Sequence, residues 1–168
     1  MQEIFKGCAW TFGNDINTES IMPSHVHHDI YKSAEICMEF YDPEFPKSAK
    51  PGDFVIAGTN FGNSSSRPAV GAFIAMKLSA VICESAARIF VRNSWNLAFP
   101  ILECKGITEM VSKGDELEVN IVTGKIKNLT TNKEIQAEKP LDVQLDRLRA
   151  GGYLQWIVDQ KEHFNEIA

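Results

Sequence analysis

The feature that most constrains this chain is the polar run Gly58-Thr-Asn-Phe-Gly-Asn-Ser-Ser-Ser-Arg67, which separates two apolar segments. Residues 53–57 before it have the composition of a short buried strand that begins after the Pro51-Gly52 turn. Residues 68–78 after it have the pattern of a helix, in which Pro68 is tolerated only in the first turn. The run is therefore predicted to connect the end of a strand to the start of a helix.

At this position the polar run is suited to bind an anion. Free backbone N–H groups and the positive end of the helix dipole gather at a helix N-terminus, where they attract anions. Arg67 adds a planar guanidinium group that can hold a carboxylate through two hydrogen bonds. The run predicts a site for a small carboxylic acid. The competing interpretation is structural, because a serine before a helix commonly caps it and would leave Arg67 as a surface side chain.

Three separated segments resemble the small subunits, or swivel domains, of the aconitase superfamily, above all those of 3-isopropylmalate dehydratase and homoaconitase. The segments 12–23 and 150–157 are similar to the first and last motifs of that family. The middle of the chain shares with it Asn60-Phe61-Gly62, Ser65-Ser66-Arg67, Ser85, Ala87-Arg88-Ile89-Phe90 and Asn93. The resemblance covers nearly the whole chain, with the motifs in the family's order.

The pattern of apolar residues indicates one α/β domain over residues 1–168. Helices are predicted at 30–41, 68–78 and 86–94, and a terminal helix at 145–159 is interrupted by Gly151-Gly152. Strands are predicted at 7–12, 53–57, 80–83, 100–104, 116–122, 125–128 and 133–137. The resemblance implies a single three-layer swivelling β/β/α domain, which periodicity alone does not supply.

Composition excludes several classes of protein. A net charge of −5 argues against a general binder of nucleic acids or anionic membranes. No segment approaches the roughly 18 continuous apolar residues that a membrane span needs. The start, Met1-Gln-Glu-Ile-Phe-Lys, lacks a basic region followed by an apolar stretch, so we expect no signal peptide and a cytoplasmic location.

The cysteines bear on the cofactor that the resemblance implies. Cys8, Cys37, Cys83 and Cys104 are scattered, and no two of them form a Cys-x-x-Cys pair. An iron–sulfur or zinc site normally needs several thiolates at close spacing, so we expect no metal or cofactor on this chain. Because aconitase-type chemistry depends on a [4Fe–4S] cluster, the resemblance implies that the cluster lies on a partner, a large iron–sulfur subunit.

The activity that the resemblance implies is that of a hydro-lyase, which removes water from, or adds it to, a small malate-type di- or tricarboxylic acid. Ser65 matches the family's serine base, Ser66 its carboxylate-binding serine and Arg67 its carboxylate-binding arginine. A serine is a poor base unless nearby donors and charge stabilise its ionised form. Asn60, Gly62 and Ser64 are expected to shape the loop rather than to react.

Two departures from the family pattern favour an alternative, a diverged non-catalytic regulatory or assembly partner with the same fold. The first departure is Pro68-Ala69-Val70, which stands where the family has Glu-His-Ala, and Ser64 also replaces a loop glycine. The second is Ser24-His25-Val26-His27-His28-Asp29, which replaces a basic specificity segment. It has three interpretations: a metal site, a solvated loop, or a histidinium at His25 that binds a substrate carboxylate. We take His25 as a candidate substrate-binding residue.

Arg88 has two interpretations as well. If its helix extends back by one turn, Arg88 can pair with Glu84, four residues earlier, as a purely structural contact. The alternative is a contact between Arg88 and the substrate. The ion pair with Glu84 is the interpretation that the sequence favours.

Overall fold

A computed structural model describes residues 3–23, 30–64 and 67–167 of the chain. In this part of the chain, seven strands form one curled sheet with the order β4-β3-β2-β1-β5-β6-β7. The strands are β1 (Ile4–Thr11), β2 (Phe54–Ala57), β3 (Ala80–Cys83), β4 (Ile101–Glu103), β5 (Glu116–Asn120), β6 (Lys125–Asn128) and β7 (Lys133–Gln136). β1 joins two halves of the sheet, because it pairs parallel to β2 after Cys8 and antiparallel to β5 up to Cys8.

The parallel half consists of β1 to β4 and forms the centre of the molecule. Every residue of β2 and β3 is buried. Parallel strands are covered on both faces, which is why these two read as continuous apolar runs rather than as alternating ones. The predicted strands at 53–57, 80–83 and 100–104 correspond to β2, β3 and β4 within one residue at each end.

The antiparallel half consists of β5, β6 and β7. Its strands alternate, with Leu117, Val119 and Ile126 buried and their neighbours more exposed. This is the pattern of a sheet with one face on the core and one in water. Gly124, at φ +73°, makes the turn between β5 and β6. The predicted hairpin strands are confirmed.

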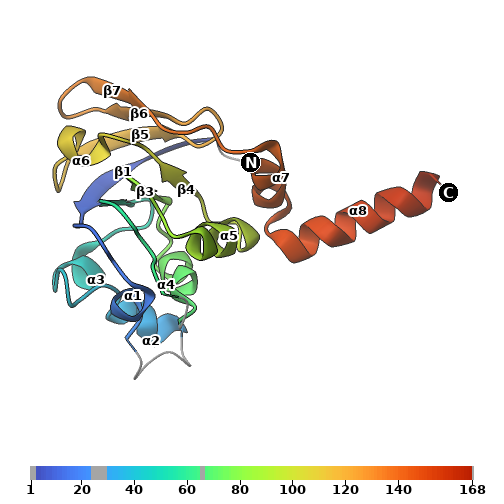
Figure 1. The fold of residues 1–168 in the computed structure, drawn as a ribbon, viewed down its shortest axis with the longest axis horizontal. Coiled ribbons are helices and arrows are strands. Elements are labelled where there is room, and N and C mark those ends of the chain that lie inside the picture. The colour runs from blue at the N-terminus through green and yellow to red at the C-terminus, as the bar shows by residue number, and fades with distance from the viewer. Residues whose placement is uncertain (1–2, 24–29, 65–66, 168) are drawn as a thin grey trace.

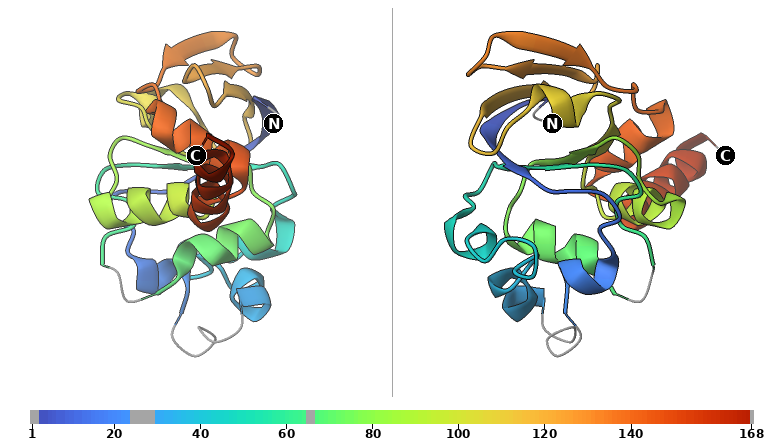
Figure 2. Two further views of the ribbon diagram at one scale, coloured as in Figure 1. Left: turned by 90° about the vertical axis from the view of Figure 1, so that its right-hand side faces the viewer. Right: turned by 60° about the vertical axis from the view of Figure 1, so that its left-hand side comes forward.

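The sheet and its helices form three layers (Figure 1). The two views of Figure 2 show the antiparallel strands on one side of the parallel strands and helices on the other. These helices are α1 (Thr18–Ile21), α2 (Ile30–Glu35), α3 (Phe45–Ser48) and α4 (Ala69–Ala75). The short helix α6 (Ile107–Met110) packs against β2, β3 and β7. The expected α/β fold with a β/β/α arrangement is confirmed.

The buried carboxylate of Asp53 fixes the point at which the sheet changes from antiparallel to parallel pairing. Asp53 lies just before β2 and accepts hydrogen bonds from Cys8 N at 3.0 Å, Trp10 Nε1 at 3.0 Å and Lys50 N at 2.9 Å. A buried acceptor is costly unless it is paired, and here three donors satisfy it. The register between β1 and β2, on which the position of the following loops depends, is thereby fixed.

The remaining helices are α5 (Arg88–Asn96), α7 (Asp142–Ala150) and α8 (Tyr153–Ile167). Helix α5 packs against β4, the edge strand of the parallel half, and α7 and α8 pack against α5. Gly151 and Gly152, at φ +84° and +130°, separate α7 from α8, as the sequence predicts. In Figure 1, α8 extends away from the rest of the molecule. No helix within residues 3–23, 30–64 and 67–167 is long and apolar enough to cross a bilayer.

The helix predicted at 30–41 is shorter in the structure, because α2 ends at Glu35. Met38 lies in the left-handed region, at φ +56°, and its N–H donates to Ile21 O at 3.2 Å. Cys37 and Met38 are both fully buried. Packing of these two side chains into the core overrides the helical preference of the segment.

Candidate active site

The loop of residues 58–64 lies where parallel strands end. It follows β2 directly, and the segments that follow β1 and β3 lie on either side of it. Phe61 forms an isolated bridge with Ala86, and Asn63 forms one with Asn17. In open α/β sheets this edge is the usual place for ligands, because loops from several strands meet there.

The segment after β1 holds one side of the loop. Thr59 N donates to Asn14 Oδ1 at 2.8 Å, and Asp15 N donates to Thr59 O at 2.8 Å. Asn60 Nδ2 donates to Asp15 Oδ1, also at 2.8 Å. Further along, Gly62 N donates to Ile16 O at 2.7 Å. Both backbone and side-chain groups of the loop are therefore fixed to the end of β1.

The segment after β3 holds the other side. Asn60 N donates to Ser85 Oγ at 3.0 Å, and Phe61 N donates to Ser85 O at 3.0 Å. Ala87 N in turn donates to Phe61 O at 2.8 Å. Glu103, the last residue of β4, also fixes this segment, since its Oε1 accepts from Ala86 N at 2.7 Å. The loop is thus held between two segments that are themselves fixed.

Three loop residues adopt the left-handed conformation that L-residues rarely take. They are Asn60 at φ +57°, Gly62 at φ +72° and Ser64 at φ +65°. Asparagine and glycine tolerate this region, whereas serine is less suited to it. At Gly62 a Cβ would also lie 2.2 Å from Phe90 Cγ. Gly62 is therefore required both by its backbone angle and by the closeness of the Phe90 ring.

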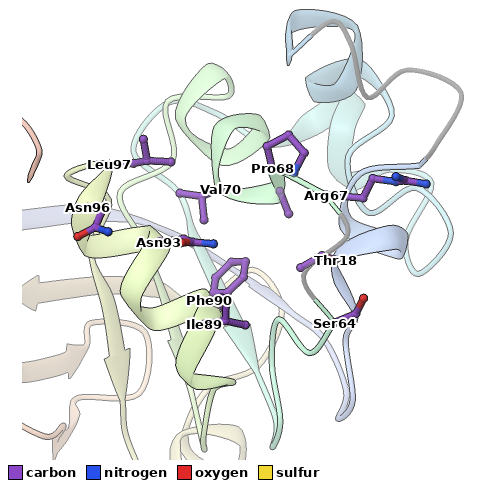
Figure 3. Close-up of a pocket in the computed structure, with 11 residues that line it drawn as sticks. Thr18, Ser64, Arg67, Pro68, Val70, Ile89, Phe90, Asn93, Asn96 and Leu97 are labelled. Atoms are coloured by element: carbon purple, nitrogen blue, oxygen red, sulfur yellow. The ribbon is translucent and has the colours of Figure 1, made fainter. Parts of the chain in front are cut away.

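A pocket of about 240 Å³ opens between this loop, the start of α4 and one face of α5 (Figure 3). Thr18, Ser64 and Arg67 contribute to it from the loop side. The opposite wall is formed from α4 and α5 by Val70, Ile89, Phe90, Asn93 and Leu97. Figure 3 shows the Arg67 guanidinium pointing away from the α5 residues. The site combines an apolar wall with a cationic residue beside a polar loop.

The structure describes four of the predicted site residues and not the other three. Asn60, Gly62, Ser64 and Arg67 all belong to the loop or to its junction with α4. Ser65, Ser66 and His25 lie outside the described residues. The predicted helix at 68–78 is the seven-residue α4, whose N-cap is Pro68 without a side-chain cap. A helix this short has a weak dipole, so Arg67 is the main positive element next to the loop.

Three of the four cysteines are buried in the core. Cys37, Cys83 and Cys104 are buried, and burial raises the pKa of the first two far above the ordinary thiol range and that of Cys104 to about 11. Within the described residues no three His, Cys, Asp or Glu side chains are grouped to hold a metal ion.

The favoured interpretation of Arg88, a pair with Glu84, is wrong. Helix α5 begins at Arg88 and does not extend back to Glu84. The Glu84 carboxylate instead accepts from Gly106 N at 2.8 Å, Thr108 N at 3.0 Å and Thr108 Oγ1 at 2.8 Å. Glu84 thus fixes the start of α6, and it forms no ion pair with Arg88 in the described part of the chain.

Residue patterns alone do not single out the anchors Asn14 and Asp15. They belong to a polar turn, Gly13-Asn14-Asp15, which is most simply interpreted as a connection. The signal that could have identified them is topological. If the strands before residues 14 and 58 are parallel neighbours, the turns that follow them must meet at one edge of the sheet.

Comparison with known proteins agrees with this architecture. The model of the aconitase C-terminal domain family matches residues 10–106. The isopropylmalate/citramalate isomerase small subunit of Methanocaldococcus jannaschii is 44% identical over 162 residues, which are 94% of this chain and 95% of that protein. The 3-isopropylmalate dehydratase small subunit of Aquifex aeolicus is 44% identical over 163 residues, 93% of this chain and 95% of that one.

A solved structure is similar over nearly the whole chain. The crystal structure of a 3-isopropylmalate dehydratase protein from Methanocaldococcus jannaschii superimposes with a TM-score of 0.91 at 34% identity, and covers 98% of this chain and 99% of that one. The 3-isopropylmalate dehydratase small subunit 1 of Methanopyrus kandleri is 39% identical over 162 residues, which are 94% of both chains. The family match spans more than half of the chain, and the relatives match it almost from end to end. The chain therefore belongs to the aconitase C-terminal domain family.

Proposed function

We propose that this chain is the small subunit of a heteromeric hydro-lyase of the 3-isopropylmalate dehydratase type, with its domain spanning residues 1–168. The observation that carries the proposal is the match to dehydratase and isomerase small subunits at 39–44% identity over more than 90% of both lengths. These relatives are named as enzyme subunits, so the alternative of a non-catalytic partner is not favoured. A cytoplasmic location stays a prediction from the sequence.

The reaction has two requirements that one subunit does not meet alone. A weakly acidic proton must leave a carbon next to a carboxylate, and a hydroxyl group must depart from the neighbouring carbon. We assign the first requirement to this chain, with Ser65 as the base. On the large subunit, a [4Fe–4S] cluster would supply a Lewis acid for the departing hydroxyl.

The part of the loop that the structure describes, residues 58–64, supports the proposed roles of Ser65 and Ser66, which follow it in the sequence. Hydrogen bonds to Asn14, Asp15 and Ser85 hold residues 59–61 in place. A rigid loop keeps reacting groups at a fixed distance, which is a large part of what an active site contributes. Ser66 and Arg67 are proposed to bind a substrate carboxylate, with Arg67 as a bidentate partner. His25 remains a candidate for a second carboxylate contact.

The pocket beside the loop supports a substrate class. Val70, Ile89 and Leu97 provide an apolar wall, and Arg67 on the loop side directs its guanidinium away from the α5 part of that wall. An acid with a small alkyl substituent combines the same two features. We therefore propose a malate-type acid with such a substituent, in keeping with the isopropylmalate and citramalate in the names of the relatives.

Anaerobic purification of the tagged chain from its own cells tests the proposal. The expected result is a co-purifying iron–sulfur subunit and hydro-lyase activity towards 3-isopropylmalate, citramalate and related acids. The isolated chain serves as the control and should show no turnover. A purified complex that contains the cluster but acts on none of these acids would contradict the assignment.

A further inference from the structure

A groove between α5 and α7 is lined by three arginines. It has a volume of about 310 Å³, and Arg88, Arg92 and Arg147 contribute their side chains to it. The apolar part of the lining comes from Val91, Trp95, Leu141 and Val143. Glu103 is the one acidic side chain among the described residues that line it.

The described part of the chain balances the positive charge of this α5–α7 groove only in part. Arg88 and Arg92 are exposed and form no ion pair with any described residue. Glu103 lies in the groove as well, with its Oε1 accepting from Ala86 N at 2.7 Å, so one carboxylate stands against three guanidinium groups. Arg147 donates from its NH1 group to Asn96 Oδ1 at 2.9 Å, but its Nε is buried and has no hydrogen-bond partner among the described residues.

The local sequence of α5 makes this arrangement unfavourable for the isolated chain. Arg88 is the first residue of the helix, where the dipole disfavours a cation, and Arg92 follows at the i+4 position. The first turn contains no acidic residue, and the N-cap Ala87 offers no side-chain cap. Natural sequences break such local rules mainly where function requires it. An anion in the groove would relieve each of these penalties.

We propose that the α5–α7 groove is a docking site for an acidic segment of the large subunit, an inference that rests on the proposed function. Charge complementarity supports this occupant, since a chain with a net charge of −5 places here two exposed arginines, Arg88 and Arg92, that form no ion pair with a described residue. Arg147 is held beside them by Asn96 and by the rings of Tyr153 and Trp156, which lie 4.9 and 5.7 Å from its guanidinium carbon. The exposed Leu141 and Val143 give such a segment an apolar contact as well. A bound peptide buries both kinds of group, which a small anion does not.

The position of the groove supports the same occupant. Helix α5 lines the pocket beside Arg67 with Ile89, Phe90 and Asn93 and lines the groove with its next face. In the proposed enzyme a large subunit must cover the site at the loop. Because adjacent faces of α5 line the pocket and the groove, a subunit that covers the pocket also lies next to the groove.

A charge-reversal experiment in the reconstituted complex tests this proposal. The variant carries Arg88→Glu and Arg92→Glu, and the control carries Lys47→Glu and Lys133→Glu, which change the net charge equally at exposed positions on α3 and β7. Association of each purified chain with the purified large subunit is measured by anaerobic calorimetric titration at three salt concentrations. Because acidic residues suit a helix N-terminus, the arginine variant should melt at the same temperature as the wild type or higher.

The expected result is a dissociation constant at least about tenfold higher for the arginine variant, with a weaker salt dependence, and one within about twofold of the wild type for the lysine control. An active wild-type complex whose arginine variant binds with unchanged affinity would overturn the docking site and leave the proposed function standing. A wild-type chain without any large subunit or hydro-lyase activity would overturn both. Inorganic phosphate that raises the melting temperature of the wild type but not of the variant, with unchanged association, would assign the groove to a small anion instead.

Discussion

At the scale of single residues, the candidate site depends on backbone conformations that few amino acids tolerate. Asp15 and Asn60 are both left-handed, at φ +57°, and their side chains are hydrogen-bonded to each other. Gly62 is also left-handed, and the Phe90 ring lies so close to it that a Cβ would be 2.2 Å from Phe90 Cγ. Such conformations persist only where surrounding contacts fix them, and they are common at functional sites.

Gly62→Ala tests the importance of this conformation. The new methyl group meets the Phe90 ring and the backbone is strained at the same time, so we expect a loss of about 2–4 kcal/mol in the free energy of unfolding. Gly114→Ala is the matched control, because Gly114 is left-handed at φ +88° with open space around it. That change should cost about 1 kcal/mol, the strain alone. Urea denaturation of both variants gives the comparison, and equal losses would show that the Phe90 contact does not matter.

At the scale of elements, the loop is useful only because the segments after β1 and β3 hold it. The pair formed by Asp15 and Asn60 is exposed, so it contributes little to global stability. It determines instead how the loop leaves β2. A misplacement of catalytic groups by about 1 Å can reduce turnover by up to two orders of magnitude.

Asp15→Ala should therefore separate activity from stability. In the reconstituted complex we expect kcat to fall on the order of 10- to 100-fold, while the unfolding free energy falls by only about 1–2 kcal/mol. Asp15→Asn keeps a side-chain acceptor and tolerates the left-handed region, so it should restore most of the turnover. Steady-state kinetics and urea denaturation of the two variants test this. If Asp15→Asn is as impaired as Asp15→Ala, the hydrogen bond to Asn60 is not what positions the loop.

Glu84 connects the end of β3 to α6, and its contribution should depend on pH. Burial disfavours the charged carboxylate, but hydrogen bonds from Thr108 and Gly106 outweigh it and hold the pKa of Glu84 below its ordinary value of 4.5. The unfolded state then binds more protons near that pH, so Glu84 stabilises the fold at neutral pH and loses this effect as pH falls through the folded-state pKa.

Glu84→Gln isolates this effect. We expect the variant to be about 1–2 kcal/mol less stable than the wild type at pH 7, because the bonds to a charged acceptor are lost. The difference should shrink progressively below pH 4.5. Urea titrations at several pH values between 7 and 3 measure it. A difference that stays constant over this range would mean that the charge of Glu84 does not stabilise the junction.

The sequence was a good guide to elements with strong periodicity. The buried runs of β2 and β3 and the alternating β5–β7 could be predicted, as could the break at Gly151-Gly152. The four-residue helices α1, α3 and α6 could not, because one turn leaves no periodic pattern and each is fixed by tertiary contacts. For the same reason α2 stops early, where Met38 turns into the core.

At the scale of the whole molecule, the proposed function requires a large subunit to complete the site. Position in the sequence could place Asn60, Gly62, Ser64 and Arg67 together on one loop, but not Asp15 or Ser85, which reach it through the sheet topology. The roles of Ser65, Ser66 and His25 stay predictions. The apolar and cationic surfaces around α5 suit a molecule that completes its active site by association.

The most direct test of the central claim is the turnover of a Ser65→Ala complex. Removal of the proposed base should reduce kcat roughly 10²–10⁴-fold, while assembly and iron content stay at wild-type levels. Ser48→Ala is the matched control, since Ser48 is exposed at the end of α3 and the change should leave turnover nearly unchanged. A Ser65→Ala complex that turns over malate-type acids at the wild-type rate would contradict the claim that this chain supplies the base.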